Sequence, residues 1–252
     1  MTEPLSLDTE STEEPLTTSR STTSQVKMGP AILTALCLWS CVLTVTPISQ
    51  EQVGRITNYI EQNIFKGLQD QYAYFVKFTD EECNKDLQTK DFDETLKEDK
   101  SAGISKKVAD KEIYNGIRMV AASYKKEKKY DIHAESRLLN PDPEMSPISK
   151  LLEGTPAAGC VVFFSLNSPC VQTCTDPKGK YNIIDKLNKH NLPTSRAFAY
   201  TKVFEKDKKK PEDEVWKNWG VLDGKMTLLR CSGNNCIKCF NNGVKNEACY
   251  KD

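Results

Sequence analysis

The stretch of sequence that decides the fold is Cys160-Val-Val-Phe-Phe-Ser-Leu166, followed at once by Asn167-Ser168-Pro169-Cys170. Residues 160–166 are almost continuously apolar and contain β-branched and aromatic side chains, which is typical of a strand covered on both faces. We therefore expect this strand to lie near the centre of its sheet. Ser168 and Pro169 then favour the start of a helix, because proline suits the first helical turn.

Strand and helix patterns alternate along the rest of the chain. Four more segments have the aromatic and β-branched character of strands: Tyr72–Thr79, Ile113–Ser123, Ala197–Phe204 and Lys225–Cys231. A helix is expected at 51–69, where apolar residues recur every three or four positions. Shorter helices are expected at 131–139, 181–190 and 212–219. About 20 residues separate the last two strands, enough for the crossover connection that parallel neighbours need.

This order of elements predicts a three-layer α/β/α domain over residues 50–231. We expect a five-stranded mixed sheet whose last two strands are parallel. The charged segment 80–111 is expected to be a long, partly helical excursion held by Cys83. Residues 232–252 are expected to form a small Cys-rich C-terminal cap.

The N-terminal region has the composition of a segment outside the folded domain. Residues 1–27 are rich in Ser, Thr and Glu and are predicted to be disordered, because they cannot bury enough apolar surface. Residues 28–49 contain an apolar run of about 15 residues, shorter than the ~20 that span a bilayer. This pattern predicts a signal peptide cleaved near Ser49 and a secreted protein, without stable membrane association after cleavage. The alternative is a type II signal anchor with residues 1–27 as a cytosolic tail.

The net charge and the number of cysteines limit which partners and which cellular compartment the sequence favours. The 35 basic and 35 acidic residues cancel, so the chain as a whole gives no electrostatic argument for a nucleic-acid or membrane partner. Ten cysteines are present, two of them in the apolar N-terminal run. If Cys170 and Cys174 bind a metal, the remaining six can form three disulfides in 15 possible pairings. These six are Cys83, Cys160, Cys231, Cys236, Cys239 and Cys249. A zinc knuckle formed by the last four is the alternative to disulfides there.

Two short motifs carry the residue types of a catalytic zinc site. His133-Ala134-Glu135 precedes Pro169-Cys170, and Cys174 follows four residues after Cys170. One imidazole and two thiols can hold zinc with a fourth position open to water, and Glu135 can move the proton of that water. The spacing of Cys170 and Cys174 puts both thiols on one face of a helix, whose positive end favours thiolates. They would lie at the carboxyl end of a central strand, where α/β sheets bind ligands.

These motifs resemble those of the AID/APOBEC-like branch of the cytidine deaminase superfamily. The signal sequence and the additional cysteines make residues 50–231 most similar to the secreted novel AID/APOBEC-like deaminases. The resemblance implies a cytidine-deaminase-like fold, and one Zn²⁺ held by His133, Cys170 and Cys174. It also implies that Glu135 is the catalytic proton shuttle in the conversion of cytosine to uracil, in single-stranded DNA or RNA.

Two alternatives differ in their predictions. A deaminase of free cytidine would act without any oligonucleotide. A non-catalytic, disulfide-rich secreted binding module would join Cys170 to Cys174 and bind no metal.

Other candidate residues have two interpretations each. The basic clusters Lys125–Lys129 and Lys206–Lys210 are interpreted as phosphate contacts or, more commonly, as solvated loops. Trp216 and Trp219 could stack on bases, although core packing is the commoner role of such a pair. His190 is expected to be a surface residue after a helix.

Overall fold

The computed structural model describes residues 47–128, 131–140, 145–179 and 181–251. The predicted disordered segment and nearly all of the predicted signal sequence belong to residues 1–46, outside the described part. Within the described part, no helix has the length and apolar character needed to cross a membrane.

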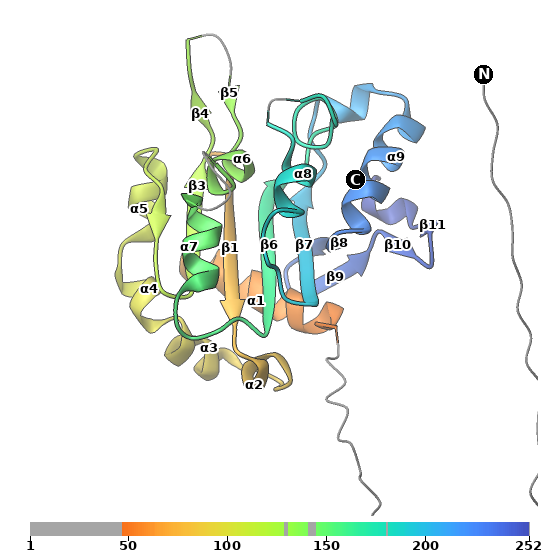
Figure 1. Cartoon of the computed structure of the whole chain (residues 1–252). Coiled ribbons are helices and arrows are strands. Elements are labelled where there is room, and N and C mark those ends of the chain that lie inside the picture. Colours follow the sequence, from red (N-terminus) through yellow and green to blue (C-terminus); the bar gives the residue numbers. More distant parts are fainter. Residues whose placement is uncertain (1–46, 129–130, 141–144, 180, 252) are drawn as a thin grey trace, which may run out of the picture. The chain divides into compact units, whose positions relative to one another are not determined.

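A seven-stranded mixed sheet forms the centre of the fold, with the strand order β2-β3-β1-β6-β7-β8-β9 (Figure 1). Its strands are β1 (Tyr72–Phe78), β2 (Tyr114–Asn115), β3 (Met119–Ser123), β6 (Cys160–Asn167), β7 (Ser195–Lys202), β8 (Thr227–Ser232) and β9 (Asn235–Lys238). The prediction that residues 160–166 form a central strand is confirmed, because β6 pairs with β1 on one side and with β7 on the other. β7 and β8 are parallel, as predicted for these two strands.

The predicted number of five strands is wrong at both edges of the sheet. The single strand expected at 113–123 is two antiparallel strands, because the chain turns tightly at Gly116, whose N–H donates to the carbonyl of Met119 at 2.9 Å. Asn-Gly is a frequent hairpin sequence. At the other edge, β9 pairs antiparallel with β8 through a turn in which Gly233 has a φ of +56°.

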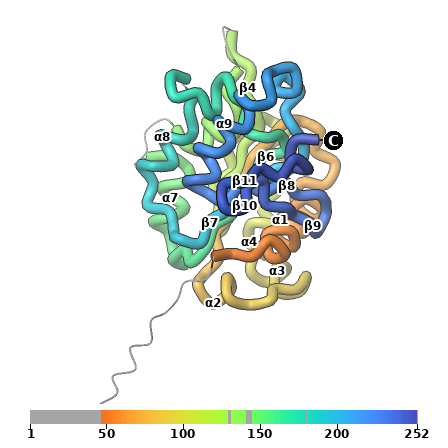
Figure 2. Tube along the Cα trace, turned by 90° about the vertical axis from the view of Figure 1, so that its right-hand side faces the viewer, coloured from red at the N-terminus to blue at the C-terminus, as the bar shows by residue number. Residues whose placement is uncertain are grey.

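Helices cover both faces of this sheet and give three layers. Their bounds are α1 (Gln50–Asn63), α2 (Asp80–Cys83), α3 (Thr89–Thr95), α4 (Lys97–Ser101), α5 (Ile104–Ala109), α6 (Ala134–Leu138), α7 (Pro147–Glu153), α8 (Ile183–Leu187) and α9 (Glu212–Asp223). Side chains of β1 alternate between two apolar cores: Ala73 and Phe75 pack with α6–α9, whereas Tyr74 and Val76 pack with α1, α3 and α5. Figure 2 shows the two groups apart, with α7 and α8 at the left and α1 and α3 toward the lower right.

The helix bounds differ from the sequence predictions where local breakers act. The helix expected at 51–69 ends at Asn63, and Gly67 in the following loop has a φ of +82°. The excursion 80–111 is four short helices, α2–α5. The helix expected at 181–190 is reduced to α8, whereas the one expected at 212–219 continues to Asp223.

The cysteines form three disulfides and leave two free thiols. The pairs are Cys83–Cys160, Cys231–Cys236 and Cys239–Cys249, so the zinc-knuckle interpretation of the last four cysteines is wrong. Cys170 and Cys174 are free and buried, which contradicts the disulfide that the binding-module alternative required.

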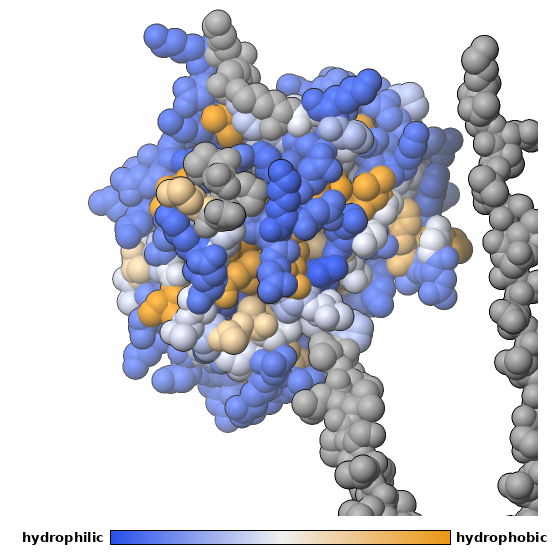
Figure 3. All heavy atoms as spheres, in the orientation of Figure 1, coloured by the Kyte–Doolittle hydropathy of each residue, from blue (hydrophilic) through white to orange (hydrophobic). Residues whose placement is uncertain are grey.

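The exposure of three side chains tests the predictions for the tryptophan pair and for His190. Trp216 and Trp219 are 1% and 0% exposed and pack in the core, so they are not available to stack on bases. His190 is buried, not exposed as expected, because its two ring nitrogens pair with Ser146 Oγ at 2.8 Å and the carbonyl of Lys186 at 2.7 Å. The face shown in Figure 3 is mainly hydrophilic, with apolar residues in small separate groups.

Candidate metal centre and pocket

His133 is placed by the short connection between the sheet and α6. After β3 the chain forms a hairpin of β4 (Lys125–Lys126) and β5 (Asp131–Ile132), and His133 is then the N-cap of α6. The helix predicted at 131–139 therefore begins only at Ala134. Glu135 lies in the first turn of α6 and is 2% exposed, since α6 packs on β1 and β3.

Cys170 and Cys174 lie in a single turn after β6. The N–H of Cys174 donates to the carbonyl of Cys170 at 3.1 Å, and the N–H of Thr175 donates to the same carbonyl. The turn does not continue into a helix, and the next helix is α8 (Ile183–Leu187), so the helix predicted from Ser168 onward is wrong. Pro177 lacks the N–H that would extend the turn. The four-residue spacing nevertheless brings both thiols to the same side, as expected.

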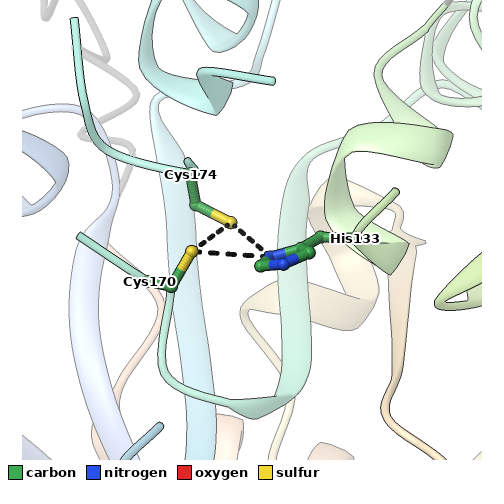
Figure 4. Close-up of side chains that lie close together, drawn as sticks. All are labelled: His133, Cys170 and Cys174. Atoms are coloured by element: carbon green, nitrogen blue, oxygen red, sulfur yellow. Dashed lines mark hydrogen bonds between the residues drawn. The ribbon is translucent and has the colours of Figure 1, made fainter. Parts of the chain in front are cut away.

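The three predicted ligand residues meet in one cluster (Figure 4). His133 Nδ1 lies 3.2 Å from Cys174 Sγ and 3.5 Å from Cys170 Sγ, and the two sulfurs are 3.5 Å apart. A tetrahedral zinc with ordinary bond lengths needs about 3.8 Å between two sulfurs and about 3.5 Å between sulfur and nitrogen. The observed separations are within a few tenths of an ångström of these values, so the donor set fits a single zinc ion.

The local charges favour the ligand form of Cys170. The hydrogen bond between the Cys170 and Cys174 thiols and the neighbouring His133 lower the pKa of the Cys170 thiol to about 3. Although burial opposes it, interaction with Cys170 raises the pKa of His133 to about 9. The hydrogen bond with Cys170, together with burial, raises the pKa of the Cys174 thiol. A thiolate is the form that binds metals.

Glu135 is held beside the cluster by two residues that sequence reasoning missed. Its Oε1 accepts a hydrogen bond from Ser165 Oγ at 2.7 Å, and its Oε2 lies 3.4 Å from Gln71 Nε2. Gln71 also donates to Ser165 Oγ, at 3.1 Å. Burial raises the pKa of the Glu135 carboxyl. A hydroxyl inside the apolar run of β6 was a usable sign that Ser165 has a polar partner.

A pocket of about 310 Å³ opens beside these residues. It is lined by Gln71, Tyr124, Asp131, His133, Glu135, Asn167, Ser168, Cys170, Phe204 and Lys206. The Phe204 ring meets the His133 ring edge-on, with 6.1 Å between ring centroids. Tyr124 and Phe204 were not singled out in the sequence, because their place at the pocket depends on how loops from different strands meet.

Among the described residues of the two basic clusters, Lys206 is the one that lines this pocket. Lys208 and Lys210 pair with Glu205 and Glu214. In the other cluster, Lys125 pairs with Glu127, and Lys129 lies outside the described residues.

A family model described as "Secreted Novel AID/APOBEC-like Deaminase 2" matches residues 53–249. The matched range contains His133, Glu135, Cys170, Cys174 and the whole sheet. No curated protein and no solved structure matches the chain.

Proposed function

Because the chain belongs to the Secreted Novel AID/APOBEC-like Deaminase 2 family, we propose that it is a zinc-dependent deaminase converting cytosine to uracil in single-stranded DNA or RNA. The observation that carries this proposal is the cluster of His133, Cys170 and Cys174, of which His133 and Cys170 line one pocket together with the buried carboxylate of Glu135. His133 Nδ1 and the two sulfurs would hold one Zn²⁺. When bound, the ion supplies Lewis acidity and makes water nucleophilic at neutral pH.

Glu135 would carry the protons of the reaction. Its Oε2 accepts a proton from the attacking water and delivers it to ring nitrogen N3 of cytosine. The carboxyl then accepts the second proton of the water from the new C4 hydroxyl and transfers it to the departing amine. A bond forms between C4 and the water oxygen, and the bond from C4 to the exocyclic nitrogen breaks. Cytosine and water thus give uracil and ammonia, and Ser165 holds the carboxylate in place throughout.

The pocket walls favour a polynucleotide over a free nucleoside. Tyr124 and Phe204 supply aromatic side chains for an unstacked base, and Lys206 supplies a cation for a backbone phosphate. Secretion is supported by the three disulfides and by the description of the family. A signal peptide at 28–49 would provide it, and a type II anchor at the same residues is the alternative.

The test compares two histidine variants of the full chain. We expect one zinc per purified chain, and uracil formation from a cytosine-containing single-stranded oligonucleotide. His133→Ala should lose both, whereas His190→Ala, at the other histidine, should keep its zinc because its ring contacts no ligand. Folded wild-type protein that takes up no zinc would end the deaminase proposal. Product from cytidine but not from the oligonucleotide would assign the enzyme to free nucleosides.

A further inference from the structure

Asp207 is a buried carboxylate on the loop that follows β7, next to the turn that carries the cysteines. It is 1% exposed, and its Oδ2 accepts a hydrogen bond from the backbone N–H of Val171 at 3.1 Å. Val171 is the residue directly after Cys170, so this bond reaches the backbone of the ligand turn itself. The other oxygen, Oδ1, is buried and has no hydrogen-bond partner among the residues that the structure describes.

The loop of Asp207 is fastened to the cysteine segment at two further points. The N–H of Ser168 donates to the carbonyl of Lys202 at 2.7 Å, and Ser168 Oγ accepts from the N–H of Phe204 at 3.0 Å. Phe204 and Lys206 on this loop line the pocket. These bonds join the cysteine segment to the loop that forms part of the pocket wall, and the bond of Asp207 is the one nearest to Cys170 in the sequence.

The backbone around Asp207 is itself held in place. Its N–H donates to the carbonyl of Phe204 at 2.9 Å, and its own carbonyl accepts from Tyr250 Oη at 3.3 Å. The Tyr250 ring packs against Trp216 and Trp219, with centroids 6.3 and 6.0 Å away. The carboxylate thus meets Val171 from a fixed position, and it does not have to be ordered when a ligand binds.

We propose that Asp207 is a positioning residue for the metal centre, which fixes the backbone at Val171 and thereby the direction of the Cys170 sulfur. This role rests on the proposed function, because it concerns the geometry of the zinc ligands. A hydrogen bond from a backbone N–H to a side-chain oxygen is directional, because it weakens steeply as its angle departs from linearity. Partners that orient metal ligands typically contribute about 10–100-fold to metal affinity.

Cobalt substitution tests the proposal without relying on activity. The full chain is stripped of metal and titrated with Co²⁺, and the visible absorption bands report the geometry of the thiolate ligands. Zinc affinity is then measured by competition. Asp207→Ala should weaken zinc binding by about 10–100-fold and alter the cobalt bands. Asp207→Asn keeps an acceptor oxygen for Val171 and should stay within about threefold of wild type, with unchanged bands.

Asp99→Ala is the matched control for simple loss of stability. Asp99 is also 1% exposed, and it accepts hydrogen bonds from Tyr114 Oη at 2.9 Å and the N–H of Arg118 at 3.1 Å, away from the metal ligands. We expect this variant to melt at a lower temperature with wild-type cobalt bands. Folded Asp207→Ala with wild-type bands and affinity would overturn the proposal.

A second measurement needs no variant. In metal-free wild-type protein, the Val171 amide should exchange its hydrogen slowly, because Asp207 holds it independently of the metal. Exchange at the rate of an unprotected amide would also overturn the positioning role. Wild-type protein that binds neither Co²⁺ nor Zn²⁺ would refute the proposed function. The exchange rate of the Val171 amide would still show whether Asp207 holds this N–H.

Discussion

The two oxygens of Glu135 differ in their partners, and the difference decides which one can carry a proton. Oε1 has a short hydrogen bond from Ser165 at 2.7 Å, whereas Oε2 is 3.4 Å from Gln71. A proton carrier must release its partner during the reaction, and the weaker contact costs less to break. Oε2 is therefore the oxygen assigned to the proton transfer.

Replacing Glu135 by Gln should lower kcat by about 10²–10⁴-fold, because the amide cannot accept and return a proton. Zinc content should stay at the wild-type value, since Glu135 is not one of the clustered ligands. Metal analysis and initial rates on the oligonucleotide check both statements. Glu94→Gln, at an exposed site, is the control and should leave both values unchanged. Full activity in the Glu135 variant would remove the residue from the mechanism.

The buried carboxyl of Glu61 makes the stability of the protein depend on pH. Glu61 belongs to α1, which covers the face of the sheet opposite to α6. Burial raises the pKa of its carboxyl from 4.5 to about 7, although a hydrogen bond from Tyr72 Oη acts against the shift. A raised pKa means that the folded protein prefers the protonated form. The stabilisation is thus fully present below pH 4.5 and is lost as the pH rises through about 7. The shift corresponds to about 3 kcal/mol.

Glu61→Gln should remove this loss, because the amide stays neutral at every pH. Urea unfolding at pH 5 and pH 8 measures it: the free energy of unfolding of the variant should fall less than that of wild type between the two values. Glu94→Gln again serves as the exposed control. Identical falls in wild type and Glu61→Gln would mean that this carboxyl does not titrate between the two pH values.

At the scale of elements, the strands were predicted better than the helices. Residues 160–166 have a local pattern, an apolar run with β-branched side chains, that has few outcomes other than a buried strand. The segment from Ser168 onward has a helix-like start, but the helix does not continue beyond one turn. Ser168 is hydrogen-bonded to the loop after β7, and Pro177 has no N–H to extend the turn. The prediction that the Cys170 and Cys174 thiols lie on one side is confirmed, because a single turn already brings positions i and i+4 together.

Two glycines in helices, Gly54 and Gly220, differ in the space available for a side chain. Substituting each by alanine therefore distinguishes the effect of close packing from that of helix propensity. A methyl group at Gly54 in α1 would overlap the backbone carbonyl of Asn234 in the β8–β9 turn, whereas at Gly220 in α9 it would lie 3.6 Å from the Phe240 ring. Gly54→Ala should therefore destabilise by about 1–3 kcal/mol, despite the better propensity of alanine. Gly220→Ala should be neutral or stabilise by up to ~1 kcal/mol. Denaturant unfolding of both variants measures the difference. Equal effects would show that α1 can move away from the turn.

At the scale of the whole molecule, the disulfides differ in the length of chain that they close. Cys83–Cys160 spans 77 residues and joins α2 to the start of the central strand, whereas Cys231–Cys236 spans five residues within one hairpin. In the loop-entropy model, the long loop contributes about 4 kcal/mol and the short loop about 2 kcal/mol. The long bridge should therefore matter more to folding.

Paired alanine variants test this order. Cys83→Ala/Cys160→Ala should lower the free energy of unfolding by about 4 kcal/mol, and Cys231→Ala/Cys236→Ala by about 2 kcal/mol. Both should retain zinc, since neither pair contacts His133 or the ligand thiols. A larger loss from the hairpin pair would contradict the entropic explanation.

The sequence by itself determined the strand-forming segments and the residue types of the candidate metal centre. These properties depend on neighbours within a few positions: side-chain periodicity, the i, i+4 spacing of Cys170 and Cys174, and the H-x-E order. Only the tertiary structure decided that His133 meets Cys170 across 37 residues of chain. It also decided which cysteines pair and that Ser165, Gln71 and Asp207 support the site. The reason is that the sheet order, with β1 between β3 and β6, sets these contacts, and local patterns do not specify strand neighbours.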